Sequence, residues 1–287
     1  MSEVILYASA SALLCGLLPS FMKTGVRRAA PSVAAALFAT VTFLFALGAA
    51  AISGTLGSLQ RIDNAGLLNL ALDGLLDALV WLCLFTALST GGVNRVMPVY
   101  NLAAAGAIGL TALLFQGRVG VWRLCCIVLL LLGTVLMESR QQKGRGYQWL
   151  LFSFLALAAA AAQLVYEARC LPALLPGSVQ RLMAALVAMV LLWCLSAAGR
   201  SLNGLKKLQL EDWLFLLLAG VAAGLAGLCD TAVERMGDST YVLPIRCCAF
   251  PLMMLFARIF HKEKMPGAAI LGLLLAVFGM FGLLLNV

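Results

Sequence analysis

Apolar residues occur in long runs along the whole chain, and short polar segments separate these runs. Ten of the runs are 18 to 23 residues long, and a helix needs about 20 predominantly apolar residues to cross the hydrocarbon core of a bilayer. The runs are Val4–Met22, Pro31–Ser53, Leu67–Leu88, Val93–Phe115, Val121–Glu138, Gln148–Arg169, Ser178–Ala198, Asp212–Glu234, Thr240–Phe260 and Gly267–Asn286. This pattern predicts an all-α membrane protein with ten transmembrane helices.

The second part of the chain repeats features of the first part at a fixed offset of 146 residues. Shared Gly and Pro positions carry the match, because Leu-rich sequence by itself aligns with almost any other Leu-rich sequence. The matched pairs are Gly74 with Gly220, Cys83 with Cys229, Val96 with Val242, Pro98 with Pro244 and Gly133 with Gly279. Internal repeats of this kind are typical of secondary transporters.

The linker between the repeats divides the ten spans into two sets of five. We expect a first five-helix repeat at 1–140 and a second at 147–287, which together form one integral membrane domain. Because five is an odd number, the second repeat must enter the membrane from the opposite face. The sequence therefore predicts two repeats with inverted topology.

Composition excludes several other classes of protein. Of the 287 residues, 63% are hydrophobic and 11% are charged, whereas a soluble domain carries roughly 25% charged residues. The single histidine and the absence of a Cys-x-x-Cys pair among nine cysteines argue against an enzyme, a metal site or any other cofactor. The net charge of +8 fits basic loops that orient a membrane protein, so we expect no nucleic-acid partner.

Short motifs at helix ends narrow the class further. Lys23 closes the first apolar run, and an Ala-Leu step at Ala87-Leu88 closes the third. Glu263 is followed by Gly272 and Gly279, nine and sixteen residues later. These features resemble the drug/metabolite transporter superfamily, specifically its EamA-like members with ten helices. In the first repeat only the later glycine, Gly133, is kept, because Gly117 stands where the family pattern has Glu.

Charged residues inside the third apolar run are candidates for function. Asp73 and Asp77 are four residues apart and Trp81 follows after another four, so all three share one helix face. An Asp at the centre of a membrane helix costs about 2.5–3.5 kcal/mol on insertion scales. We expect this pair to bind substrate or protons, and the alternative is that it fixes the helix to a neighbour.

The expected topology places other polar residues in the same half of the membrane. Tyr166 and Glu167 lie near the end of the sixth run, Asp230 near the end of the eighth, and Arg246 early in the ninth. Asp230 and Arg246 are at similar depth, which favours an ion pair. The alternative interpretation of the charged residues that follow Asp230 is that they belong to a loop exposed to water.

The opposite half of the membrane contributes Lys23 with Tyr100 and Asn101. In the family that the chain resembles, a central cavity lies between helices that carry most of these side chains. A cavity rich in carboxylates suits an amine, a zwitterion or a proton.

The sequence therefore predicts a secondary transporter that moves a small polar or cationic metabolite or drug by alternating access, with proton coupling as a further hypothesis. One alternative is an organic-phosphate or nucleotide-sugar exchanger of the same fold, and another is a membrane assembly subunit that transports nothing. The expected partners are the lipid bilayer and a small-molecule substrate, and the expected state is a monomer or homodimer in the bacterial cytoplasmic membrane. Loop charges, thirteen Lys and Arg on one face against six on the other, place the termini outside, whereas the family resemblance places them inside.

Overall fold

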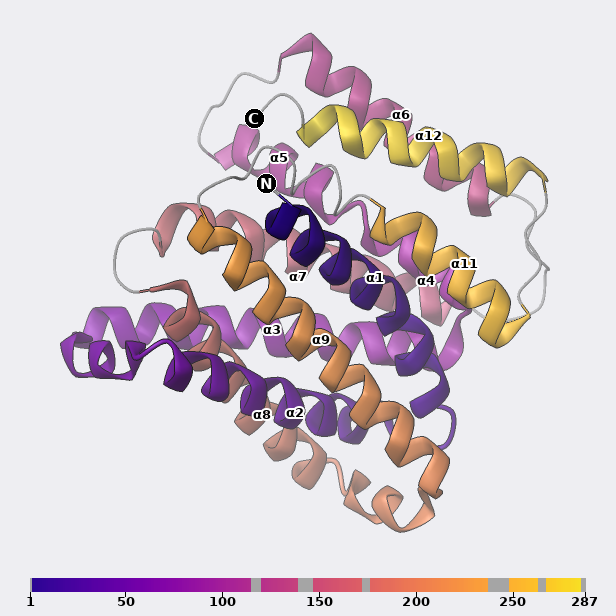
Figure 1. Cartoon of the computed structure of the whole chain (residues 1–287). Helices are drawn as coiled ribbons and strands as arrows, with labels where there is room; N and C mark the ends of the chain where they lie inside the picture. Colours follow the sequence, from indigo (N-terminus) through magenta and orange to yellow (C-terminus); the bar gives the residue numbers. More distant parts are fainter. Residues whose placement is uncertain are drawn as a thin grey trace.

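The fold of the chain is entirely helical over the residues that the structure describes (Figure 1). The structure is a computed structural model, and it describes residues 2–114, 120–138, 147–171, 176–236, 248–262 and 267–284. The α-helices are α1 (Ser2–Gly25), α2 (Pro31–Ile52), α3 (Asn64–Thr90), α4 (Val93–Tyr100), α5 (Ala103–Leu114), α6 (Val121–Glu138), α7 (Gln148–Cys170), α8 (Gly177–Ala198), α9 (Leu210–Met236), α11 (Ala249–His261) and α12 (Gly267–Leu284). Two 3₁₀-helices, η1 (Thr55–Arg61) and η2 (Ser201–Lys207), follow α2 and α8.

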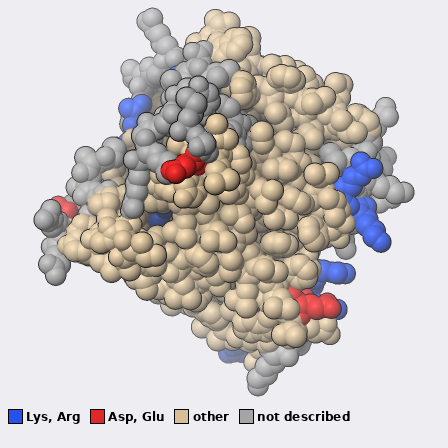
Figure 2. All heavy atoms as spheres, in the orientation of Figure 1, with Lys and Arg blue, Asp and Glu red and all other residues tan. Residues whose placement is uncertain are grey.

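Six of these helices are long and apolar enough to cross a membrane: α1, α2, α3, α7, α8 and α9. Helices α6, α11 and α12 contain shorter apolar stretches. Leu68 and Phe278 are examples of large apolar side chains that are more than 60% exposed, as expected where a helix faces lipid. Figure 2 shows a surface that is largely without charge, and most of the visible Lys and Arg side chains lie near its margins. The predicted multi-pass membrane protein is confirmed, and six of the ten predicted spans are seen in the described part of the chain.

The fourth predicted span is not one continuous helix. The sequence predicts a helix over Val93–Phe115, but the structure has α4 and α5, separated by Asn101 and Leu102. Pro98 lies inside α4, and proline removes one N–H donor and crowds the carbonyl of the preceding turn. The Leu102 N–H then bonds to the Val99 carbonyl, three residues back, at 3.1 Å. The prediction of an unbroken helix was wrong, because the structure interrupts it at Asn101 and Leu102.

The elements recur along the chain at the offset seen in the sequence. Helices α2, η1, α3 and α6 begin and end 146 residues before α8, η2, α9 and α12 respectively. The residues before η1 and η2, Gly54 and Arg200, both have left-handed backbone conformations, with φ of 65° and 53°. The recurrence therefore extends from residue identities to the local backbone.

Contacts between the two parts of the chain are reciprocal at the same offset. The Ser32 hydroxyl on α2 bonds to the Ser201 hydroxyl on η2 at 3.0 Å, and the Thr55 hydroxyl on η1 bonds to the Ser178 hydroxyl on α8 at 3.0 Å. Position 32 corresponds to 178 and position 55 to 201, so each bond is the counterpart of the other. The two parts thus meet through equivalent surfaces.

Glycines bring α6 and α12 into backbone contact, and the two helices lie side by side in Figure 1. A Cβ atom added to Gly133 would lie 2.5 Å from the Gly272 carbonyl oxygen, and one added to Gly279 would lie 2.7 Å from the Cys126 carbonyl oxygen. Small residues allow membrane helices to approach this closely. The glycines at the ends of both repeats therefore serve the packing of these two helices.

Candidate substrate cavity

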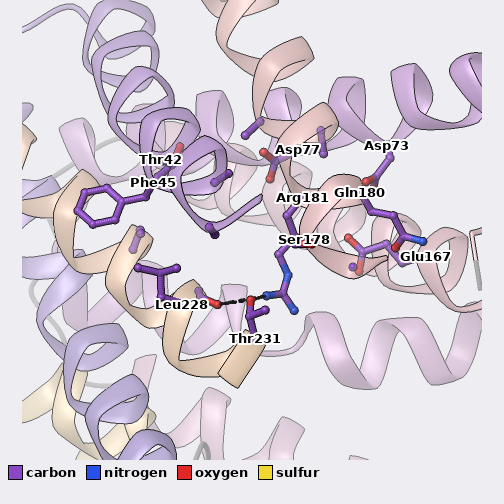
Figure 3. Close-up of a pocket in the computed structure, with 18 of the residues that line it drawn as sticks. Thr42, Phe45, Asp73, Asp77, Glu167, Ser178, Gln180, Arg181, Leu228 and Thr231 are labelled. Carbon is purple, nitrogen blue, oxygen red and sulfur yellow. Dashed lines mark hydrogen bonds between the residues drawn. The ribbon is translucent and has the colours of Figure 1, made fainter. Parts of the chain in front are cut away.

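A cavity of about 480 Å³ lies between α2, α3, α7, α8 and α9. Its lining uses the first two thirds of α3, the first half of α8 and the second halves of α2, α7 and α9, so it lies toward one end of the helix bundle. The lining residues are Thr42, Phe45, Ala46, Ala49, Asp73, Asp77, Trp81, Gln163, Glu167, Gly177, Ser178, Gln180, Arg181, Ala184, Ala185, Ala223, Gly224, Gly227, Leu228 and Thr231. Figure 3 shows this cavity.

Three carboxylates from two helices form one wall of the cavity. Asp73 and Asp77 extend from α3, and Glu167 extends from the last turns of α7. The Gln163 side chain donates to an oxygen of Asp73 at 3.3 Å and to an oxygen of Glu167 at 3.0 Å, so it orients both groups. In the described part of the chain, none of the three carboxylates forms an ion pair with Lys or Arg. This wall is therefore acidic.

The three carboxylates differ in accessibility and in depth. Glu167 is exposed, Asp77 is half-buried, and the Asp73 residue is only 3% exposed. Asp77 lies one turn further along α3 than Asp73, toward Trp81 and the centre of the span. A cationic ligand would therefore meet Glu167 near the end of the bundle and reach the aspartates further inside.

The cavity also has a cationic group on another wall. Arg181 lies near the start of α8, and its Nη1 donates to the carbonyl of Gly227 at 3.1 Å and to the hydroxyl of Thr231, both on α9. Thr231 also donates to the Gly227 carbonyl at 2.8 Å. Sequence reasoning placed Arg181 at no site and included it only in the six Lys and Arg residues counted for one membrane face. Its position one turn inside an apolar run, in the same half of the membrane as Asp73, was the signal that could have identified it.

Aromatic and small side chains form the apolar part of the lining. The rings of Trp81 and Phe38 are 4.5 Å apart, which anchors Trp81 against the core. Gly224 on α9 lies so close to α2 that a Cβ atom there would meet the Phe45 ring at 2.3 Å. Small residues at this contact let α2 and α9 approach, while Trp81 and Phe45 provide apolar surface in the cavity.

The other end of the bundle is closed by large apolar side chains. Met22, Phe38, Phe85 and Leu88 are completely buried there, at 0% exposure. Lys23 near the end of α1 donates from Nζ to the carbonyls of Leu88, at 2.7 Å, and Gly91. These carbonyls belong to the C-terminal end of α3, where the helix dipole favours a cation. Lys23 therefore joins α1 to α3 at the closed end.

The structure brings four of the predicted site residues together. Asp73, Asp77, Trp81 and Glu167 all line the cavity. Tyr166 instead points to α3, where its hydroxyl donates to the side-chain oxygen of Asn69 at 2.8 Å. Tyr166 is not among the lining residues of this cavity, because it is next to Glu167 on a helix and faces a different direction.

The other predicted site residues lie elsewhere. Asp230 accepts a bond from the Ser11 hydroxyl at 2.7 Å, which ties α9 to α1, and it is outside the described lining. Tyr100 packs half-buried against the apolar core, and Asn101 follows it at the break between α4 and α5. Arg246 lies outside the described residues, so the predicted ion pair between Asp230 and Arg246 is not tested.

The fold and the cavity define a multi-pass, all-helical integral membrane protein with a polar internal cavity. Residues 2–139 match the EamA-like transporter family, which confirms the resemblance seen in the sequence for this part of the chain. Among curated proteins, none matches the chain. One of 28 matching solved chains, described as "Crystal structure of protein", is 18% identical with a TM-score of 0.66 over 99% of both chains. At this identity the solved structure shows the fold alone.

Proposed function

We propose that this protein is a secondary transporter that moves a small polar or cationic metabolite or drug across the membrane by alternating access. One observation carries the proposal: the membrane-embedded cavity holds three carboxylates that form no ion pair with described Lys or Arg residues. Ionisable groups within membrane spans are costly and usually mark a pathway for substrate or ions. A role in helix packing alone would not need carboxylates that face an open volume.

The recurrence at 146 residues supports alternating access. We propose that residues 1–140 and 147–287 form two repeats of inverted topology, related by a pseudo-two-fold axis in the membrane plane. The helix bounds that recur at a constant offset and the reciprocal hydroxyl bonds between the two repeats support this arrangement. The structure has a cavity at one end of the bundle and a packed apolar core at the other. If the two repeats exchanged conformations, the packed end would open and the cavity would close.

The charge of the cavity favours a cationic substrate. Three carboxylates in a poorly hydrated space repel one another, and a bound cation or proton relieves this repulsion. Proton coupling follows if protons and substrate compete for the same carboxylates. An organic-phosphate or nucleotide-sugar exchanger would need several cationic groups, whereas the described lining has Arg181 opposite three acids.

A transport assay in proteoliposomes tests this function. The purified full-length protein should accumulate labelled amines or amino acids faster than protein-free vesicles do, and a pH gradient should change the rate. Organic phosphates serve as the matched anionic probes. Uptake of phosphates alone, or no uptake of any probe above protein-free vesicles, would contradict the proposal.

Lys23→Met is expected to weaken the closed end of the bundle. The substitution keeps an apolar stem of similar length but removes the bonds from Nζ to the carbonyls of Leu88 and Gly91. A hydrogen bond to a charged group contributes about 1.5–3 kcal/mol, so the population open at this end should rise about tenfold or more. The measurement is the labelling rate of a single cysteine at Met97, a residue that is 1% exposed, on a background without the native cysteines.

A cysteine at Ala46, in the cavity lining, gives the reciprocal measurement. Its labelling should become slower in Lys23→Met, because the cavity closes as the other end opens. Arg27→Met, at an exposed position one turn away, is the matched control and should change neither rate. Faster labelling at both positions would indicate that the whole protein has become less rigid. It would contradict a specific role of Lys23 in keeping this end of the bundle closed.

A further inference from the structure

We infer that the closed end of the bundle binds the headgroups of anionic phospholipids through a set of exposed basic residues. These residues, which we call the basic rim, are Arg27, Arg200, Arg258 and Lys262. Sequence reasoning used them only as a signal for the orientation of the protein in the membrane. The inference concerns a lipid partner and does not depend on the proposed transport function.

The basic rim lies where membrane-spanning helices end. Arg27 is in the loop between α1 and α2, and Arg200 lies between α8 and α9, and all four helices are long enough to cross the membrane. Lys262 directly follows α11, and Arg258 is one turn before it. Long basic side chains at helix ends reach the level of the lipid headgroups. Figure 2 shows Lys and Arg side chains along the margin where α1 and α11 end.

Contacts between neighbouring elements bring the parts of the basic rim onto one surface. The 3₁₀-helix η2, which follows Arg200, is joined to the start of α2 by the bond between the Ser32 and Ser201 hydroxyls. On the other side of the α1–α2 loop, α11 contacts α1, where Nε2 of His261 lies 3.2 Å from the Ser20 carbonyl oxygen. The basic residues of both parts of the chain are therefore presented together at the closed end.

The fold itself does not require these charges. The position 146 residues before Arg200 is Gly54, which precedes η1 in the same left-handed conformation. The other positions that correspond to the basic rim are also uncharged, with Ala173 for Arg27, Ala112 for Arg258 and Gln116 for Lys262. The turn before η1 thus forms without a charge at the opposite end of the bundle, so the charge at Arg200 serves something other than the turn.

Two residues of the basic rim have a backbone conformation that favours glycine. The φ angle is 53° at Arg200 and 51° at Lys262, and these are the non-glycine residues with positive φ in the described part of the chain. Side chains are uncommon in this region because Cβ crowds a carbonyl oxygen. A charge that only sets orientation could lie at any position of these loops. A basic side chain at a strained position instead indicates a partner at that place.

An anionic phospholipid has the chemistry that fits this surface. Each Lys or Arg near an anionic membrane surface strengthens binding about fivefold. In the described part of the chain, the one ion pair joins Arg28 to Asp212 at 3.6 Å, so the basic rim keeps its charge, with Glu211 as an exposed acid nearby. Leu202 on η2 is exposed beside Arg200. The surface therefore offers basic groups to phosphates and an apolar side chain to the acyl region.

Lipid binding to the purified full-length protein tests this inference. The protein is kept in micelles of a neutral detergent, and palmitoyl-oleoyl phosphatidylglycerol or palmitoyl-oleoyl phosphatidylcholine is added. Native mass spectrometry from ammonium acetate measures the bound lipid. Phosphatidylglycerol should bind the wild type about tenfold or more tighter than phosphatidylcholine. The preference should fall with added salt, because the Debye length decreases from about 10 Å at 0.1 M to about 3 Å at 1 M.

The double variant Arg200→Gly with Lys262→Gly should lose this preference. Glycine adopts the left-handed conformation without strain, so the protein should stay folded, which a thermal melt verifies. The affinity for phosphatidylglycerol should fall at least about tenfold, while that for phosphatidylcholine stays unchanged. Arg169→Gln, at an exposed position at the other end of the bundle, is the control and should retain the wild-type ratio.

Three results would overturn the inference. Equal binding of the two lipids to the wild type would exclude a preference for anionic headgroups. An unchanged ratio in the double variant would leave the basic rim with a role in orientation alone. Displacement of phosphatidylglycerol by inorganic phosphate at constant ionic strength would assign the surface to free anions. None of these results affects the proteoliposome assay, so a failure of the transport function is recognised separately.

Discussion

Asp77→Asn is expected to lose at least about 30-fold in affinity for amines and zwitterions while the protein stays folded. Asp77 lies on the wall of the cavity one turn further along α3 than Asp73, next to Trp81. Removing one partner of a desolvated, hydrogen-bonded charge pair costs about 2–5 kcal/mol, and 1.4 kcal/mol corresponds to a factor of ten in Kd. The measurement is calorimetric binding of the tightest ligand found for the wild type, with a thermal melt to verify folding.

Two matched variants make this prediction specific. Asp73→Asn should have a smaller effect, because Asp73 is more deeply buried and is already oriented by Gln163. Asp230→Asn should leave binding unchanged, because Asp230 accepts a bond from Ser11 outside the described lining. Equal losses in Asp77→Asn and Asp230→Asn would show that the structure does not identify the binding wall.

The pH dependence of binding gives a further test of the aspartate pair. If protons compete with the cationic group of the substrate, binding to the wild type strengthens as the pH rises and protons leave the pair. The dependence should disappear in Asp77→Asn and remain, with a smaller amplitude, in Asp73→Asn. An unchanged pH dependence in both single variants and in the double variant would exclude proton coupling through these residues.

Gly133→Leu is expected to destabilise the packing of α6 on α12. A Cβ atom at this position would lie 2.5 Å from the Gly272 carbonyl oxygen and 2.6 Å from the Ala276 nitrogen. Backbone atoms cannot move aside as a flexible side chain can, so the helices must separate. Overpacking of this kind costs about 1–3 kcal/mol or more, which lowers the melting temperature by about 5–10 °C. The measurement is the thermal melt of the purified protein in detergent.

The reciprocal contacts predict an equal effect at the matching position. Gly279→Leu should lower the melting temperature to a similar extent, because a Cβ atom there would lie 2.7 Å from the Cys126 carbonyl oxygen. Gly48→Leu is the control, since nothing lies within 4 Å of a Cβ atom at that helical glycine. A control variant that melts as early as Gly133→Leu would show that the loss comes from leucine at any helical glycine.

Local sequence patterns were sufficient to predict the six long helices and part of the cavity. A run of about 20 apolar residues favours a membrane helix whatever its neighbours are, and the six long spans of the structure follow from this rule alone. The spacing of Asp73, Asp77 and Trp81 places them on one helix face, and the structure shows all three in one cavity. The repeat at an offset of 146 residues could also be seen in the sequence, and the bounds of the helices in the structure follow the same offset.

Only the tertiary structure decided which polar groups meet, because their contacts join residues that are far apart in the chain. Gln163 reaches Asp73 across 90 positions, Arg181 reaches Thr231 across 50, and Ser11 reaches Asp230 across 219. Helix periodicity fixes the direction of a side chain relative to its own helix, but the rotation of each helix against its neighbours depends on packing. No single apolar run specifies this packing between helices. The packing therefore places Arg181 in the cavity lining and Asp230 outside it.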